Sequence, residues 1–200
     1  SNYLGTLTAT VTQETIGDGA GVVSWQYHVT DAALNPLAAG EHKTETFRIT
    51  IQDDHGLTTY RDITVELVGS NDSPVIAVAS GDSAYQMLTE TDAGLNAQGT
   101  LTVTDVDVLD AVHATVLSVS ATGSGIEHQY DNATLLSMLT VAPDPVLDSN
   151  GARTGSLTWT FDSHGEAFNF LPNGWESVLS YTIQVSDGQG GFDTQVVQIK

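Results

Sequence analysis

The chain has 200 residues, of which 25 are Asp or Glu and only 5 are Lys or Arg, so its formal net charge is −20. This charge argues against nucleic acid and anionic membrane surfaces as partners, because both attract basic patches. Apolar residues make up 40% of the chain, which argues against a disordered acidic tail. A folded chain this acidic repels itself unless something neutralises it, and divalent cations are the natural candidate.

Cysteine is absent, and no run of about 18 apolar residues is present, so we expect no membrane insertion of this segment. The lack of cysteine fits either a reducing compartment or an exported protein that is stabilised by ions. The placement of the aspartates, described below, favours the second. The chain opens with Ser1-Asn2 and shows no secretory signal, so we expect a fragment of a larger secreted protein.

Apolar and polar residues alternate along most of the chain, which is typical of half-buried antiparallel strands. In chain order, the residues expected to share an inward face are Val23, Trp25, Tyr27 and Val29; Phe47, Ile49 and Ile51; Ile63, Val65 and Leu67; Leu101 and Val103; Leu157, Trp159 and Phe161; and Tyr181, Ile183 and Val185. Clusters of Gly, Asn, Asp and Pro separate these runs and predict turns. A short helix is expected over Asn132 to Leu139, with Asp131 or Asn132 as its cap, and single turns before Gly40 and Gly174. The pattern predicts an all-β sandwich.

The beginning of the chain repeats its end at a constant offset of 159 − 25 = 134 positions. The matched pairs include Trp25 with Trp159, Tyr27 with Phe161, Gly40 with Gly174, Phe47 with Tyr181 and Asp53 with Asp187. Residues 1–70 are therefore predicted to be a partial repeat that lacks its first part, and residues 71–200 a complete one. Trp25 and Trp159 are both expected in a core.

A short joint, residues 69–75, connects the two repeats. Pro74 restricts Ser73 to extended conformations, and a flexible tether would be longer and richer in Gly and Ser. Asn71 and Asp72 add two oxygen-bearing side chains. We therefore expect an ordered joint.

Three aspartates, Asp105, Asp107 and Asp110, follow the predicted strand that contains Leu101 and Val103. Because strand parity sends Leu101 and Val103 into the core, Asp105 and Asp107 must lie just beyond it, at one pole of the sandwich. Carboxylates this close repel unless they are solvated or bridged by a cation, and Ca²⁺ takes six to eight oxygen ligands. A solvated acidic turn and a calcium site both fit this spacing.

Other oxygen ligands are available for the same pole. Glu90 and Asp92 lie just upstream of the strand, and Asn71 and Asp72 lie in the joint. The aspartate run is not an EF-hand, because Leu109 occupies a position where that motif needs Asp or Asn.

Asp53 and Asp187 occupy matching positions in two predicted hairpin turns. Aspartate is common there for backbone hydrogen bonding alone, and we expect that role for Asp187. Asp53 is a candidate ligand as well as a turn residue, because the C-terminal pole of the first repeat is expected to face the joint.

Residues for other chemistry are scarce. The six histidines have no zinc-like spacing and are expected at the surface. Trp175 follows Gly174 in a loop; it would stack on a sugar if exposed, but we expect it to pack against the neighbouring short helix. Motifs for a serine, cysteine, phosphate-binding or zinc-hydrolase site are absent, so we do not expect an enzyme.

Three segments resemble VCBS repeats, the cadherin-like modules of giant bacterial adhesins that are often exported with RTX signals. Gly99 to Asp110 resembles the opening of such a repeat, Tyr181 to Ile199 its close, and Gly69 to Ile76 the joint between repeats. The resemblance implies tandem Greek-key (cadherin/Ig-like) β-sandwiches with Ca²⁺ at the joints. It also implies a non-catalytic spacer at the bacterial cell surface, outside the cell.

In such a spacer the partners are neighbouring repeats of the same polypeptide, and a distal domain holds the surface glycan or protein that is bound. By resemblance to the cadherin joint, Asn71 and Asp72 match linker ligands, Asp105 and Asp107 match the Asp-x-Asp of the following module, and Glu90 matches a strand-edge carboxylate. Residues 123–152 are longer and more irregular than the family pattern. The main alternative is a module that uses this region and exposed aromatics to bind a glycan or peptide, and a domain of a secreted hydrolase is the third possibility.

Overall fold

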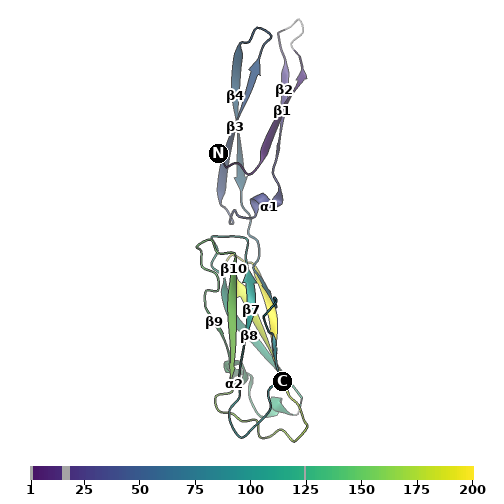
Figure 1. Cartoon of the computed structure of the whole chain (residues 1–200), viewed down its shortest axis with the longest axis vertical. Helices are drawn as coiled ribbons and strands as arrows, with labels where there is room; N and C mark the ends of the chain where they lie inside the picture. The colour runs from purple at the N-terminus through teal and green to yellow at the C-terminus, as the bar shows by residue number, and fades with distance from the viewer. Residues whose placement is uncertain (1, 15–18, 124) are drawn as a thin grey trace. The chain divides into compact units, whose positions relative to one another are not determined.

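The computed structural model describes residues 2–14, 19–123 and 125–200. The chain divides into two compact units, unit 1 (Ser1–Ser70) and unit 2 (Asn71–Lys200), which are described separately. Strands account for most of the regular structure in both units (Figure 1), as the alternating sequence predicts. The all-β prediction is confirmed. Within the described ranges no helix is long and apolar enough to cross a membrane.

Unit 2 is a sandwich of two four-stranded sheets. The first sheet has the order β5 (Val75–Ala77), β7 (Asn96–Thr104), β10 (Thr154–Asp162) and β9 (Leu139–Ala142). The second has the order β6 (Tyr85–Gln86), β12 (Phe192–Ile199), β11 (Val178–Ser186) and β8 (His113–Thr122). All neighbours are antiparallel except β6 and β12. If the strands are lettered in chain order, with β5 and β6 as the two halves of A, the sheets are ABED and A′GFC, the immunoglobulin-like Greek-key arrangement.

The core of unit 2 consists of the inward-facing residues that the alternation predicts. Leu101, Leu157, Trp159 and Tyr181 have no exposed surface. Trp159 lies opposite Gly99 of β7, and a Cβ on Gly99 would meet the indole ring, so only glycine fits there. The indole N–H of Trp159 donates to the carbonyl of Ser83 (2.7 Å), which satisfies its one buried polar atom. The core position predicted for Trp159 is confirmed.

Two short helices close one end of unit 2: η1 (Ile126–His128) and α2 (Asn132–Ser137). Asp131 is the N-cap of α2, because its carboxylate accepts the backbone N–H of Thr134 at 2.7 Å. The predicted short helix and its cap are confirmed. The irregular region around these helices is packed rather than free: its buried apolar residues are Ile126, Leu135, Met138, Leu139, Val146 and Leu147.

Unit 1 contains two hairpins, β1 (Thr6–Gln13) with β2 (Val22–His28) and β3 (His42–Gln52) with β4 (Thr58–Val68), joined through α1 (Asp31–Leu34). At the 134-residue offset, β2, β3 and β4 correspond to β10, β11 and β12 of unit 2. The hairpins meet where Tyr27 stacks near Phe47, with ring centroids 5.8 Å apart. Beside them Glu45 is buried and accepts a hydrogen bond from the Tyr27 hydroxyl (2.9 Å).

The core position predicted for Trp25 is wrong. Trp25 lies at the position of Trp159, but 48% of its surface is exposed. The alternation correctly places Trp25 on the face that points between the hairpins. However, β2 has no second neighbouring strand within the described residues, so nothing covers the indole.

Candidate metal centre in unit 2

The aspartate run forms a tight loop at the end of β7. Asp105 still continues the sheet edge, because its N–H donates to the carbonyl of Arg153 (3.1 Å). The loop then turns on itself: the N–H of Asp107 donates to the Asp105 carboxylate (3.0 Å), and the N–H of Asp110 donates to the Asp107 carbonyl (3.1 Å). As a result all three side chains point inward and are buried, with exposed fractions of 3%, 1% and 6% for Asp105, Asp107 and Asp110.

A fourth buried carboxylate, Asp187, follows β11. Its Oδ1 accepts the N–H groups of Gln189 (2.7 Å) and Gly191 (3.0 Å) and so builds the turn into β12. Its Oδ2 accepts the side-chain N–H of Asn71 (2.8 Å). A Cβ on Gly191 would collide with this Oδ2 and approach Cα of Ser73, so the turn needs glycine to let the carboxylate and the joint come together.

The first residues of the joint belong to this site. Besides the contact of Asn71 with Asp187, the N–H of Asp72 donates to the Asp107 carboxylate (2.7 Å). Four residues later the N–H of Ile76 donates to Asp193 (3.0 Å). Side chains of unit 2 therefore hold segment 71–76 in place.

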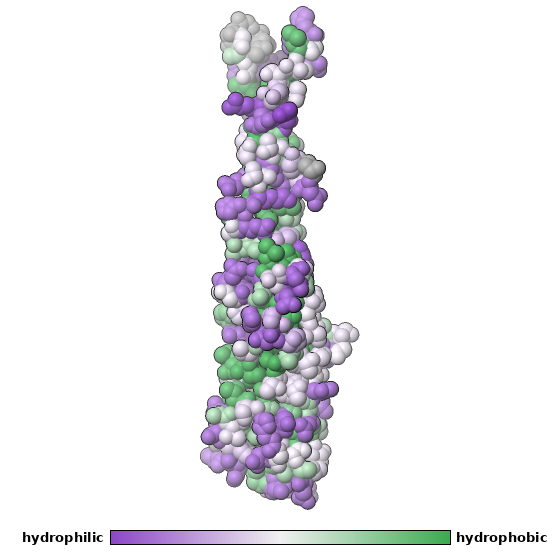
Figure 2. All heavy atoms as spheres, turned by 90° about the vertical axis from the view of Figure 1, so that its left-hand side faces the viewer, coloured by the Kyte–Doolittle hydropathy of each residue, from purple (hydrophilic) through white to green (hydrophobic). Residues whose placement is uncertain are grey.

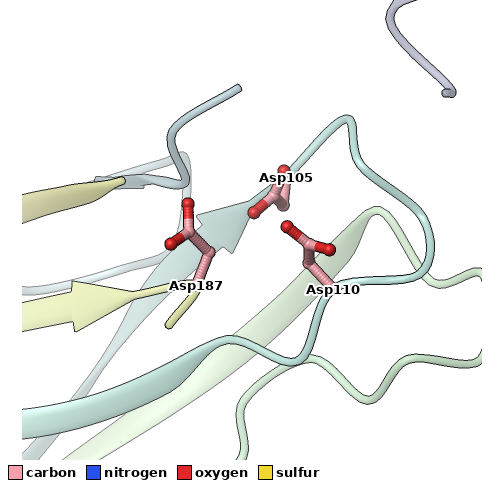
Figure 3. Close-up of side chains that lie close together, drawn as sticks. All are labelled: Asp105, Asp110 and Asp187. Atoms are coloured by element: carbon pink, nitrogen blue, oxygen red, sulfur yellow. The ribbon is translucent and has the colours of Figure 1, made fainter. Parts of the chain in front are cut away.

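Several buried oxygens of these segments lack a hydrogen-bond donor. Asp105, Asp110 and Asp187 each place one carboxylate oxygen within 4.8 Å of the others, and Figure 3 shows Asp105 and Asp110 turned toward each other with Asp187 beside them. The buried oxygens that form no hydrogen bond in the described structure are Asn71 Oδ1, Asp105 Oδ2, Asp107 Oδ1 and Asp110 Oδ2. A buried unsatisfied acceptor costs about 1–3 kcal/mol, and more when it is charged. Four such oxygens on Asn71 and the aspartate loop, together with the close approach of Asp105, Asp110 and Asp187, indicate a cluster suited to a cation.

The electrostatics of the cluster point the same way. Burial, reinforced by the charges of Asp107, Asp110 and Asp187, raises the pKa of Asp105 to about 6, although the N–H of Asp107 opposes the rise. Burial also raises the pKa of Asp107 and of Asp110, with neighbouring aspartates contributing. Among the described residues no ion pair involves these carboxylates. The cluster therefore holds negative charge without a protein counter-charge.

The donor set fits Ca²⁺. All of the converging atoms are carboxylate or amide oxygens, the ligands that this hard cation prefers. Calcium–oxygen bonds of about 2.3–2.6 Å allow two ligands of one ion to lie up to roughly 5 Å apart. The observed limit of 4.8 Å lies within that span.

No family model matches this chain. A search of curated proteins likewise finds no match. Among solved structures, the chain is similar to the ASH / PapD-like domain of human CEP192 (PapD-like domain 7), with 15% identity, coverage of 64% of this chain and 82% of that one, and a TM-score of 0.34. A likeness this low bears on neither function nor fold, and the fold assignment rests on the strand order of unit 2.

The structure brings together five of the predicted ligands: Asn71, Asp72, Asp105, Asp107 and Asp110. Of these, Asp72 enters the site through its backbone N–H. Sequence reasoning assigned Asp187 only the turn role, whereas the structure gives each of its oxygens a different task.

The expected position of Glu90 is wrong. Glu90 lines a pocket with Leu95 and Trp175, at the end of unit 2 where β7 begins. The aspartates follow the other end of β7, nine strand residues away. Glu90 and the cluster therefore lie at opposite poles of the sandwich.

Asp53 lies in unit 1, at the tip of the β3–β4 hairpin. Its Oδ1 accepts the N–H groups of His55 (3.0 Å) and Leu57 (2.8 Å), the same turn that Asp187 makes. This tip lies at the other end of β4 from Val68, where the chain leaves unit 1. The pole that carries Asp53 is therefore opposite to the one expected from the sequence.

The pocket that contains Glu90 has a volume of about 650 Å³ and an apolar floor. Trp175 and Met87 line it with 63% and 60% of their surfaces exposed, and Glu176 pairs with Lys200 at 2.9 Å. The expectation that Trp175 packs against a short helix is wrong; the side chain lines an open pocket instead.

Proposed function

We propose that unit 2 binds a calcium ion through Asn71, Asp105, Asp107, Asp110 and Asp187. We further propose that the chain is a non-catalytic, calcium-stiffened spacer of a bacterial adhesin, outside the cell. The observation that supports this proposal best is that four buried oxygens without hydrogen bonds, one on Asn71 and three on the Asp105–Asp110 loop, accompany the close approach of Asp105, Asp110 and Asp187. Buried charges require either counter-charges or a metal, and among the described residues no Lys, Arg or His forms an ion pair with these carboxylates.

The proposed stiffening acts on the joint. Without a counter-charge, Asp105, Asp107 and Asp110 repel one another and the neighbouring Asp187, which weakens the hold of Asp187 on Asn71 and of Asp107 on Asp72. Ca²⁺ supplies that counter-charge when bound. Segment 71–73 then stays attached to unit 2, and less of the joint is free to bend.

The expected energy per site is modest. Extracellular calcium modules bind with Kd of about 10⁻⁴ to 10⁻³ M. At ten times Kd, ligand binding stabilises the folded state by RT ln 11, about 1.4 kcal/mol. A single site gives a measurable shift in melting temperature, and a series of such modules would become compliant or rigid according to the calcium concentration.

Calcium titration of the whole chain tests the site. We expect calorimetry to show binding and the melting temperature of unit 2 to rise with CaCl₂ and fall with EGTA, while that of unit 1 stays constant. Small-angle scattering is expected to show a narrower distribution of chain dimensions with calcium. Absence of binding heat and of any melting shift at 10 mM CaCl₂ would refute the proposal.

Asp187→Asn and Asp53→Asn form a matched pair of variants. Both keep an oxygen that accepts the turn N–H groups, so both hairpins are expected to form. Only Asp187 has its second oxygen in the cluster. Asp187→Asn is therefore expected to weaken calcium binding at least tenfold and Asp53→Asn to leave it unchanged; equal effects would contradict this assignment.

Asp105→Asn separates an ion site from a merely structural cluster. It removes a buried charge that lacks a counter-charge, so it is expected to stabilise unit 2 in EGTA and to abolish the stabilisation by calcium. If Asp105→Asn instead destabilised the metal-free protein, the carboxylate would have a structural partner and the ion would not be needed.

The pocket beside Trp175 supports a second candidate function, recognition of a glycan. An exposed indole at an apolar pocket with carboxylates nearby is a suitable surface for stacking a sugar ring. Binding on a glycan array that is lost in Trp175→Ala and kept in Trp25→Ala, the other exposed tryptophan, would support this function. If neither the unmodified chain nor Trp25→Ala binds a glycan, the second candidate is contradicted and the spacer proposal remains.

A further inference from the structure

Among the described residues each sheet of unit 1 has two strands, whereas each sheet of unit 2 has four. In unit 2, β10 pairs with β9 on one side and β7 on the other, and β11 pairs with β12 and β8. In unit 1, the corresponding strands have one neighbour each within the described residues: β2 pairs with β1, and β3 pairs with β4. The outer edge of β2 therefore presents unpaired backbone N–H and C=O groups, and so does that of β3 except at Thr46, whose carbonyl accepts the Tyr3 hydroxyl (2.6 Å).

The apolar face between these edges is open as well. Trp25 is 48% exposed where Trp159 has no exposed surface, and Ile51 is 45% exposed where Val185 is fully buried. The indole N–H of Trp159 donates to Ser83, whereas that of Trp25 forms no hydrogen bond in the described residues. Figure 2, which is coloured by residue hydropathy, shows hydrophobic residues exposed among hydrophilic ones on the surface of the chain. The inner face of unit 1 is thus covered at Phe47 and Glu45, by Tyr3 and Leu4, and open at Trp25 and Ile51.

The edge of β2 carries none of the features that prevent edge-to-edge pairing. Natural edge strands are usually protected by charged residues, proline or bulges. The whole of β2, Val22–His28, contains no Asp, Glu, Lys, Arg or Pro. Its outward residues Ser24 and Gln26 are neutral, and its inward residues are apolar or aromatic. The strand has the composition of one that lies inside a sheet.

We infer that unit 1 is an acceptor for two β-strands that take the places of β7 and β8 in unit 2. One strand runs antiparallel along β2 and the other antiparallel along β3, and their inner residues cover Trp25 and Ile51. The partner is a strand pair of the same repeat type as residues 96–122. This surface lies wholly in unit 1 and does not depend on the calcium site.

The register in unit 2 defines what the partner must contain. Trp159 lies opposite Gly99 and Leu157 opposite Leu101, so the strand along β2 needs glycine opposite Trp25 and an aliphatic residue two positions later. A side chain in place of that glycine would collide with the indole, as a Cβ on Gly99 would. The strand along β3 needs small or aliphatic residues, because Val185 lies opposite Ala114 and Tyr181 opposite Val119.

A graft onto the whole chain tests the inference. A second copy of residues 71–138, which contains β7, β8 and α2, is fused before Gly5 of the 200-residue chain, so that it precedes β1 as it precedes β9 in unit 2. Trp175→Phe removes the exposed fluorophore outside unit 1. We expect Trp25 emission to shift to the blue, acrylamide quenching of Trp25 to fall several-fold, and amides of β2 and β3 to gain at least tenfold protection from hydrogen exchange.

The matched control carries Leu101→Asp and Val103→Asp in the grafted copy alone, which places charge on the face that would cover Trp25. This control is expected to leave Trp25 as accessible as in the ungrafted chain. Equal accessibility of Trp25 in the ungrafted chain, the graft and the control would overturn the inference.

The ungrafted chain provides a second test. If Trp25 is already protected at low protein concentration, the face is closed within the chain and the inference fails. If protection appears only as the chain dimerises, measured by light scattering, the occupant is a second copy and the strand-pair partner is wrong.

Discussion

Units 1 and 2 carry the same alternating pattern but differ in what that pattern buries. Trp159 and Trp25 occupy equivalent strand positions, yet only Trp159 is enclosed. The period of two determines which side of a strand faces inward, and the neighbouring strands determine whether that side loses its water. Inward orientation and burial are therefore separate properties, and β2 shows the first without the second because it has one neighbouring strand among the described residues.

The hairpin turns differ in a similar way. Asp53 and Asp187 make the same two backbone contacts through one oxygen. The second oxygen of Asp187 reaches the acidic cluster because Gly191 leaves room for it. The corresponding position in unit 1 is Leu57, which is 73% exposed. A shared turn motif thus serves folding in one unit and a candidate ion site in the other.

The largest expected difference between the units comes from removing the paired tryptophans. Trp159→Ala should lower the free energy of unfolding of unit 2 by about 3–5 kcal/mol, the usual cost of emptying a large core site. Trp25→Ala should cost unit 1 less than about 1.5 kcal/mol, because half of the side chain already contacts solvent. Chemical denaturation followed separately in each unit by hydrogen exchange measures both; similar losses would show that the two tryptophans are equally enclosed in solution.

Lowering the pH should change the folding stability of the two units in opposite directions. Without metal, the pKa of Asp105 in folded unit 2 is about 6 rather than 3.8. The folded state then binds more protons than the unfolded state between about pH 4 and 6, so unit 2 loses stability as pH rises through this window. The full effect is on the order of 3 kcal/mol, since 2.2 pKa units correspond to about that energy.

In unit 1 the buried Glu45 behaves in the other sense. Burial alone raises the pKa of Glu45, but hydrogen bonds from the Leu4 N–H and the Tyr27 hydroxyl outweigh it and lower the pKa below its ordinary value. Unit 1 should therefore lose stability as pH falls below about 4.5. Melting curves in EGTA from pH 7 to 4 check both signs, and parallel trends in the two units would contradict the comparison.

The smallest expected effect separates the two turns. Gly191→Ala forces a Cβ against the Asp187 carboxylate and Ser73, so it should destabilise unit 2 by about 1–3 kcal/mol and weaken its response to calcium. Leu57→Ala, at the equivalent position, should change unit 1 by less than about 0.5 kcal/mol, because that side chain is exposed. Thermal melts with and without calcium measure both effects, and a calcium response unchanged by Gly191→Ala would show that the close approach is dispensable.

Much of this architecture can be predicted from the sequence. Alternation predicts the strands, and the parity of Leu101 and Val103 places Asp105 and Asp107 just beyond the core. The acidic residue before a helix-forming run identifies the cap of α2. These predictions succeed because each depends on a local pattern with one physical cause.

The predictions that fail depend on longer-range geometry. Glu90 lies before β7, and the aspartates follow the end of β7. Because β7 has nine residues, its two ends lie at opposite poles of the sandwich. Burial of Trp25 depends on strands that its own sequence does not specify. The sequence predicts a single role for Asp187 because a turn alone explains an aspartate; the contrast between Gly190-Gly191 and Gly56-Leu57 is the signal for its second role.

The attachment of Asn71 has a mechanical consequence. Tension along the polypeptide from the side of Ser70 reaches Asn71 and Asp72 before it reaches β5, the first strand of unit 2. The contacts of these two residues with Asp187 and Asp107 therefore bear the load first. Under tension these two contacts would break while the strands of both sheets remain hydrogen-bonded. Because the contacts can re-form when the force is released, unit 2 can extend at this point without unfolding.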